Sequence, residues 1–105
     1  LVFVGDALEE NPDAVCAAAG RLALAGVPAF MFQEGANAKV EATFREVARL
    51  TRGAYGAFDA NAAGTLRDLL RAVAIYAVGG ATALADHARG AGSAVRRLAD
   101  QMGRK

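Results

Sequence analysis

The chain has 105 residues and a formal net charge of +1, with 54% hydrophobic and 22% charged residues. This composition is typical of one globular domain with a modest core, and it excludes a disordered chain. The near-neutral charge gives no support for nucleic-acid binding. The single cysteine, Cys16, excludes an internal disulfide and a cysteine-based metal cluster. With no recognisable signal peptide and no spanning apolar run, we expect a cytoplasmic protein that does not bind membranes.

The first six residues are the stretch around which the other elements are organised. Leu1–Val4 is a short apolar run that ends at Gly5 and Asp6. Such a run predicts a strand buried on both faces of a parallel sheet. Functional groups in open parallel sheets lie just beyond the carboxyl ends of strands, so Asp6 is the main candidate for chemistry. Because the chain begins inside this strand, we expect it to be the C-terminal part of a longer protein.

Strand and helix patterns then alternate along the chain. Apolar runs predict strands, and apolar residues at helical spacing between Gly and Pro boundaries predict helices. We expect strands over residues 1–4, 27–32 and 54–58 and helices over residues 12–25, 38–50 and 62–78. Asn11 is the expected N-cap of the first helix, and Pro28 belongs at a strand start or on an edge.

The residues after the Gly79-Gly80 break are rich in alanine. They predict two helical pieces interrupted at Gly90 and Gly92, packed only weakly on the remainder. We therefore divide the chain into an α/β part, residues 1–78, and a helical C-terminal tail, residues 79–105. The expected fold class is α/β with three layers, in which helices cover a mostly parallel sheet of sequential strand order.

Several short motifs together resemble the C-terminal half of a von Willebrand factor type A domain. Leu50-Thr51-Arg52-Gly53-Ala54-Tyr55 is similar to the family's Leu-Thr-Gly-Gly-aromatic phrase before its last strand. Gly26-Val27-Pro28 and Leu66-Arg67-Asp68-Leu69-Leu70 stand in the corresponding order, and the likeness covers Leu1–Val78. The resemblance implies half of a doubly wound, Rossmann-like sheet.

The resemblance also implies a metal-ion-dependent adhesion site for a divalent cation such as magnesium. Asp6 matches the last ligand of that site. The family's Asp-x-Ser-x-Ser motif and its ligating Thr would precede Leu1, and Ala7 stands where the family usually has Gly. Because Mg²⁺ takes about six oxygen ligands, one carboxylate is insufficient. We expect the full-length parent to bind the cation and the isolated chain to bind none tightly.

The resulting hypothesis is a protein-interaction module whose metal-bearing edge grips an acidic group of a protein partner. One alternative is a metal-free structural or interaction fragment, in which Asp6 only caps the following turn. A second is a Rossmann-type half-domain for a small molecule, although Gly5-Asp6-Ala7 is not the Gly-rich turn that it requires. No nucleophile–base arrangement can be assembled around the single histidine, His87, so we do not expect an enzyme.

The other polar and aromatic candidates have simpler explanations. Glu9 and Glu10 are expected to be solvated charges, and Tyr55 and Tyr76 packing residues. Arg96-Arg97 is expected to be a solvated helix face. An unpaired first strand would leave an apolar edge, so we expect the isolated chain to be marginally stable or to self-associate there.

Overall fold

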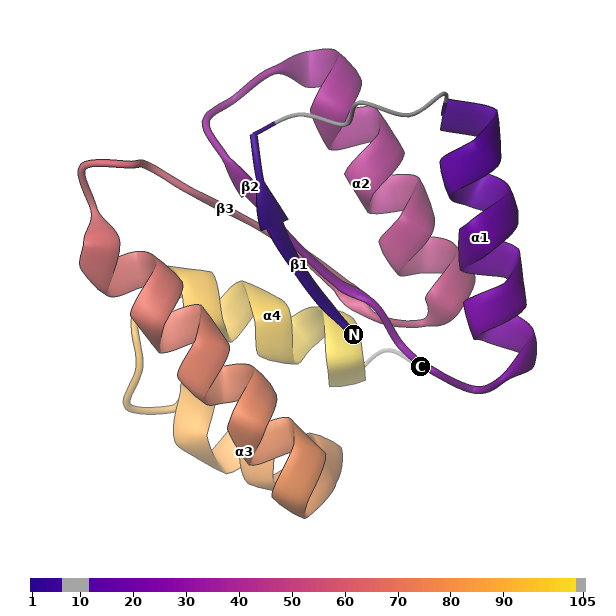
Figure 1. Ribbon diagram of the computed structural model, residues 1–105. Coiled ribbons are helices and arrows are strands. Elements are labelled where there is room, and N and C mark those ends of the chain that lie inside the picture. The colour runs from indigo at the N-terminus through magenta and orange to yellow at the C-terminus, as the bar shows by residue number, and fades with distance from the viewer. Residues whose placement is uncertain (7–11, 104–105) are drawn as a thin grey trace.

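The computed structural model describes residues 1–6 and 12–103, which form an α/β fold (Figure 1). Its sheet has three parallel strands in the order β1-β2-β3. The elements are β1 (Val2–Gly5), α1 (Pro12–Leu24), β2 (Phe30–Glu34), α2 (Ala38–Thr51), β3 (Ala54–Phe58), α3 (Ala63–Ala88) and α4 (Ser93–Gly103). The predicted alternation and the parallel, sequential sheet are confirmed. Asn11, the predicted cap of α1, lies outside the described residues.

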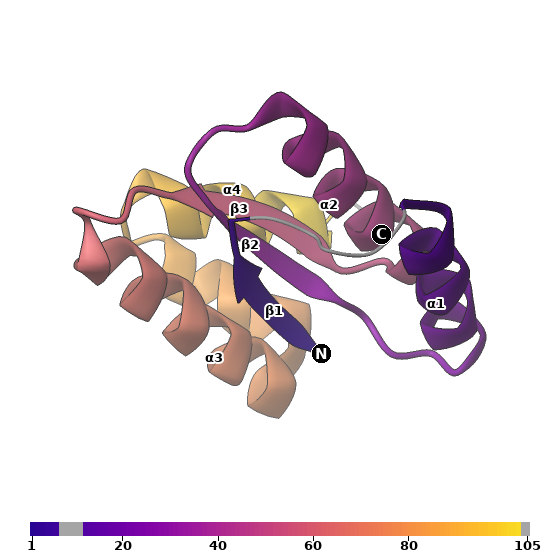
Figure 2. The same cartoon turned by 45° about the horizontal axis from the view of Figure 1, so that its top comes forward.

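Helices pack on both faces of the sheet, with α1 and α2 on one face and α3 and α4 on the other (Figures 1 and 2). Successive strand residues face opposite sides, so each strand contributes to two cores. Phe30 and Phe32 of β2 face α3 and α4, in a core with Ala54, Leu69, Ala72, Leu84, Ala88, Val95, Leu98 and Met102. Met31 and Tyr55 face the other side, in a core with Ala19, Ala29, Phe44, Val47 and Ala48.

The sequence signals for α2 are the clearest in the chain, and the helix follows them closely. Asn37 is the N-cap, and its side chain accepts hydrogen bonds from the backbone N–H groups of Lys39 and Val40. Its apolar residues recur at helical spacing and pack on the sheet, with Phe44, Val47 and Ala48 buried. The helix ends one residue later than predicted, at Thr51, whose hydroxyl accepts a bond from Ala29 N–H at 2.9 Å. That bond ties the end of α2 to the start of β2.

The second strand begins later than predicted. The apolar run predicted residues 27–32, whereas β2 spans Phe30–Glu34. Pro28 has no N–H for a sheet ladder, and Ala29 gives its N–H to Thr51 rather than to a strand. The strand consequently extends into the polar residues Gln33 and Glu34, beyond its predicted end at residue 32.

The predicted helix break at Gly79-Gly80 is present as a kink within α3. Gly80 has φ 74° and ψ −167°, outside the helical region, and the helix resumes to Ala88. By length and composition alone, Gly64–Ala88 could cross a membrane, the one such helix in the described ranges. Only 17% of its most apolar stretch is buried, and one such helix is weak evidence for a membrane span, so the absence of membrane binding stays a prediction.

The expectation that residues 81–105 pack weakly is wrong. Leu84, Val95 and Leu98 are at most 1% exposed, and they join the same core as Phe30 and Phe32 of β2. Alanine-rich composition suggested little apolar surface, but the few large side chains of α4 all lie on one stripe that faces the sheet. The division into residues 1–78 and 79–105 stays a prediction, although the core runs continuously through both.

Candidate functional site

The carboxyl edge of the sheet carries Asp6 after β1, Glu34 at the end of β2 and Asp59 after β3. Asp6 is exposed, and no described residue donates a hydrogen bond to its carboxylate. Asp59 instead accepts a bond from the backbone N–H of Asn61 at 2.9 Å. The described residues contain no group of three or more His, Cys, Asp or Glu side chains able to hold a metal ion. Asp6 as a metal ligand therefore stays a prediction, since the described residues form no cluster of three such side chains around it.

The alternative role of Asp6, as a cap for the following turn, falls on residues outside the described ranges, as do Ala7, Glu9 and Glu10. The simpler explanations given to other candidates agree with the structure. Tyr76 packs its ring against Phe30 at 5.7 Å between centroids. Arg96 and Arg97 are exposed on α4.

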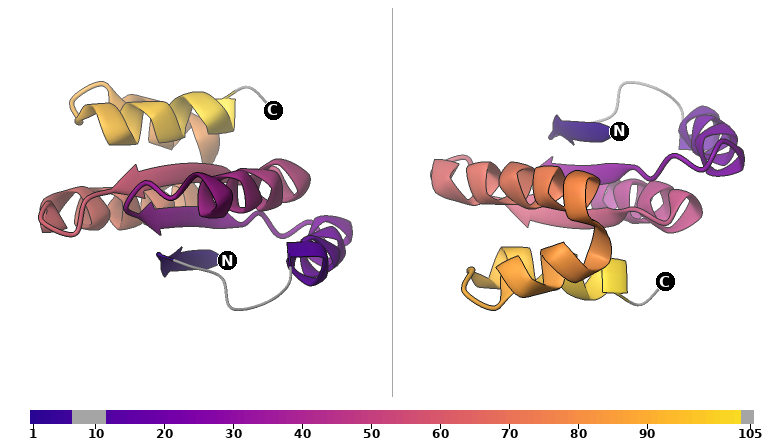
Figure 3. Two further views of the ribbon diagram at one scale, coloured as in Figure 1. Left: turned by 90° about the horizontal axis from the view of Figure 1, so that it is seen from above. Right: turned by 90° about the horizontal axis from the view of Figure 1, so that it is seen from below.

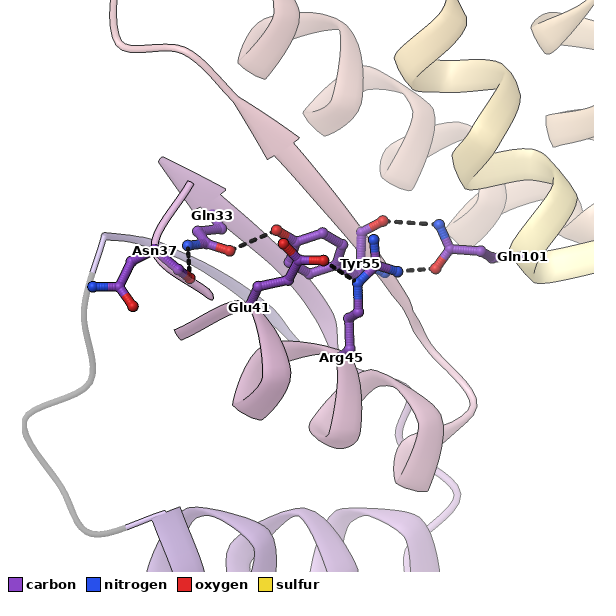
Figure 4. Close-up of polar contacts among 6 residues, drawn as sticks. All are labelled: Gln33, Asn37, Glu41, Arg45, Tyr55 and Gln101. Atoms are coloured by element: carbon purple, nitrogen blue, oxygen red, sulfur yellow. Dashed lines mark hydrogen bonds and ion pairs between the residues drawn. The ribbon is translucent and has the colours of Figure 1, made fainter. Parts of the chain in front are cut away.

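The two edges of the sheet differ in how their backbone groups are satisfied. Backbone bonds between strands alternate along a parallel ladder, so every second residue of an edge strand turns its N–H and C=O outward. On β3 these outward groups include those of Tyr55. Gln101 of α4 bonds both: Tyr55 N–H donates to Gln101 Oε1 at 2.8 Å, and Gln101 Nε2 donates to Tyr55 O at 2.8 Å (Figure 4). The Gln101 amide therefore takes the place of a fourth strand.

Removing this amide should measurably destabilise the protein. Gln101→Ala leaves the N–H and the carbonyl of Tyr55, whose bonds to Gln101 are partly buried, without partners, at a cost of about 1–3 kcal/mol in the free energy of unfolding. Gln101→Glu can still accept from Tyr55 N–H but cannot donate to Tyr55 O, so it should fall between wild type and Gln101→Ala. Urea unfolding of wild type, Gln101→Ala and Gln101→Glu measures their free energies of unfolding. Equal stability of all three would show that the amide does not cap the strand.

A polar network that the sequence did not predict lies between α2 and the sheet (Figure 4). Gln33 is fully buried; its Nε2 donates to the carbonyl of Asn37 at 3.0 Å, and its Oε1 accepts from the Tyr55 hydroxyl. Arg45, paired with Glu41, lies 4.3 Å from the centre of the Tyr55 ring. Burial, followed by the nearby Glu41 charge, raises the pKa of Tyr55, so its hydroxyl remains a donor at neutral pH. The network fixes β2, β3 and the loop before α2 relative to one another.

The opposite edge, along β1, has no such cap. The carbonyl of Leu1 accepts from Phe30 N–H at 2.8 Å, so by alternation the backbone groups of Val2 and Val4 point away from β2. Figure 3 shows α4 beyond β3 but no described element beyond β1. Val2 is 39% exposed and Val4 42% exposed. Phe3 faces the other side of the sheet, where its ring meets Phe44 edge-on at 5.4 Å between centroids.

The expectation that β1 is buried on both faces is therefore wrong. The helices cover β2 and β3, and the strand at the edge receives only partial cover from Phe44. The separate expectation of an exposed first-strand edge is confirmed. Sequence patterns could not distinguish these outcomes, because a run of apolar residues is the same whether or not a neighbouring strand lies beside it.

Comparisons of this chain with protein-family models, curated proteins and solved structures returned no match. The α/β character and the parallel sheet are properties of the structure itself. The resemblance to a von Willebrand factor type A domain stays a prediction from the motifs quoted above.

Proposed function

We propose that this chain is a protein-interaction module that binds an extended segment of another polypeptide along β1. The observation that supports this most directly is the difference between the two sheet edges. One is closed by Gln101, whereas the other presents outward backbone groups at Val2 and Val4 beside exposed apolar side chains. Soluble proteins usually cover, charge or bend such an edge, since it is a template for strand pairing. No charge, proline or helix protects Val2–Gly5 within the described structure.

The chemistry of β1 indicates the kind of segment that fits. Strand addition supplies affinity through main-chain hydrogen bonds and specificity through alternate side chains. Val2 and Val4 lie on the same face as Phe30 and Phe32, so the partner strand should carry apolar residues at alternate positions on that face. The module then acts by sheet extension and needs no catalytic residue.

The metal-dependent form of this proposal assigns Asp6 a role at the end of the same strand. A partner paired along β1 would reach the carboxyl edge next to Asp6, where a divalent cation such as magnesium could bridge to an acidic group of the partner. Since the described residues contain no group of three or more ligating side chains, ligands would also have to come from elsewhere in the parent protein. The metal-free alternative uses the same edge without the cation.

The isolated chain should self-associate through β1, because a second copy offers the same apolar edge. Val4→Lys places a charge at the outward edge and should weaken association at least about tenfold, or about 1.4 kcal/mol. Val78→Lys is the matched control, since Val78 is 93% exposed on α3 and lies outside the edge. Sedimentation equilibrium over a wide concentration range measures both. A wild-type chain that stays monomeric throughout, or equal weakening by the two lysines, would contradict binding at β1.

Magnesium separates the two forms of the proposal. In the full-length parent, Asp6→Ala should weaken partner binding only when magnesium is present if Asp6 is a ligand. If the Asp6→Ala variant binds the partner as tightly as wild type when magnesium is present, only the metal-free form of the proposal remains. In the isolated chain, added magnesium should not change the association constant, because one carboxylate cannot hold the ion.

A further inference from the structure

An open cleft of about 630 Å³ lies at the opposite end of the sheet from Asp6, near the amino ends of the strands. The C-terminal ends of α1, α2 and α4 border it, together with the middle of α3. Its lining is mainly apolar and includes Leu24, Pro28, Leu50, Tyr76 and Met102. Leu24 is 93% exposed, so a large apolar side chain stands uncovered at the mouth of the cleft.

Arg52 is the only charged residue among the described residues that line this cleft. It is exposed, and none of the ion pairs among the described residues involves it. The Tyr76 hydroxyl, in the same lining, also has no hydrogen-bond partner among those residues. Arg52 and Tyr76 thus both line an apolar hollow, and a guanidinium and a phenol can each donate to an anion.

The backbone of Arg52 gives independent support for a role of its side chain. Arg52 ends α2 in the left-handed conformation, with φ 59° and ψ 30°, and its N–H bonds the carbonyl of Ala48. It is the only residue other than glycine with positive φ in the described structure. Glycine is the usual residue at this helix-ending position because it adopts the conformation without steric cost. A long charged side chain here is therefore disfavoured by the backbone, and such outliers concentrate at ligand-binding positions.

The geometry points to this cleft as a binding site for a small amphipathic carboxylate, such as a medium-chain fatty acid. The apolar tail would lie in the cleft and remove the exposed surface of Leu24 and Leu50 from water. The carboxylate would pair with the planar guanidinium of Arg52, which presents two parallel N–H donors, and would accept from the Tyr76 hydroxyl. The site is independent of partner binding at β1 and goes beyond the proposed function.

Decanoate is the probe, titrated into the full chain by calorimetry, with decanol as the uncharged analogue of equal length. Arg52→Gly removes the guanidinium while favouring the left-handed backbone, so the melting temperature should stay equal or rise. Decanoate affinity should fall at least about tenfold, whereas decanol affinity should not change. Arg71→Ala, which removes an exposed arginine of α3 outside the cleft lining, should leave decanoate affinity unchanged.

Arg52→Lys keeps the charge but loses the two-donor geometry, so it should bind decanoate with intermediate affinity. It also provides the test if Arg52→Gly unfolds. Absence of decanoate binding to the wild-type chain would overturn the site. Equal affinity of wild type and the Arg52 variants, or equal losses from Arg52→Gly and Arg71→Ala, would overturn the role of Arg52.

Discussion

Replacing Leu98 with alanine should lower the free energy of unfolding by about 2–5 kcal/mol. Leu98 is 1% exposed and packs in the core shared by β2, α3 and α4. Truncation loses the transfer free energy of the removed methyl groups and leaves a cavity, because closely packed neighbours relax only in part. For a chain of this length, such a loss is a large share of the total stability.

Leu24→Ala is the matched control, since it removes the same atoms from a side chain that is 93% exposed. Its effect should be within about 0.5 kcal/mol, as for most surface substitutions. Urea unfolding of both variants, with equal m-values, measures the difference. If Leu98→Ala were as mild as Leu24→Ala, α4 would be the weakly packed tail that the alanine-rich sequence suggested.

Gly53→Ala should cost about 3 kcal/mol in the free energy of unfolding, the upper end of the usual range for overpacking, because the added methyl group has no space. An ideal Cβ at Gly53 would lie 1.8 Å from the carbonyl oxygen of Ala29, a backbone atom that cannot turn aside. Gly53 joins α2 to β3 and is buried, and its N–H bonds the carbonyl of Ala48 at 2.9 Å. Relieving the clash would separate α2 from the start of β2 and disturb the bond between Thr51 and Ala29.

Gly20→Ala is the same type of substitution as Gly53→Ala, but its expected effect on stability is the opposite. Gly20 lies within α1, and nothing lies within 4 Å of its ideal Cβ. Alanine favours the helix there by about 0.5–1 kcal/mol, so this variant should be more stable than wild type. Thermal melts of the two variants should move in opposite directions. Melts that move together would show that the approach of Gly53 to Ala29 does not decide the effect.

The two proposed surfaces depend on the same framework. The Gly53 connection and the Thr51 hydroxyl hold the end of α2 against β2, and the adjacent Arg52 borders the apolar cleft. At the far edge, the Gln101 amide closes β3, so that β1 is the sheet edge left to a partner.

Local patterns in the sequence were sufficient for most of the secondary structure. The β3 prediction over residues 54–58 agrees with the observed strand, and α2 differs from its prediction by one residue. The signals for α2 are apolar residues at helical spacing and a Gly boundary at Gly53, and the signal for β3 is a short, largely apolar run between turn residues. These signals depend only on residues a few positions apart, so they can be recognised in a single sequence before the fold is known. The order of the elements then favours a parallel sheet with helical crossovers.

Long-range contacts decided the features on which the proposed function depends. Gln101 caps Tyr55 across 46 positions of sequence, and no local pattern indicates that a glutamine on a helix will close a strand. Burial of α4 and exposure of β1 depend likewise on which apolar faces meet when the layers pack. An apolar run indicates only that its burial would be favourable. The tertiary arrangement determines which apolar runs are buried. Here the helices cover β2 and β3, and β1 keeps the edge that we propose a partner fills.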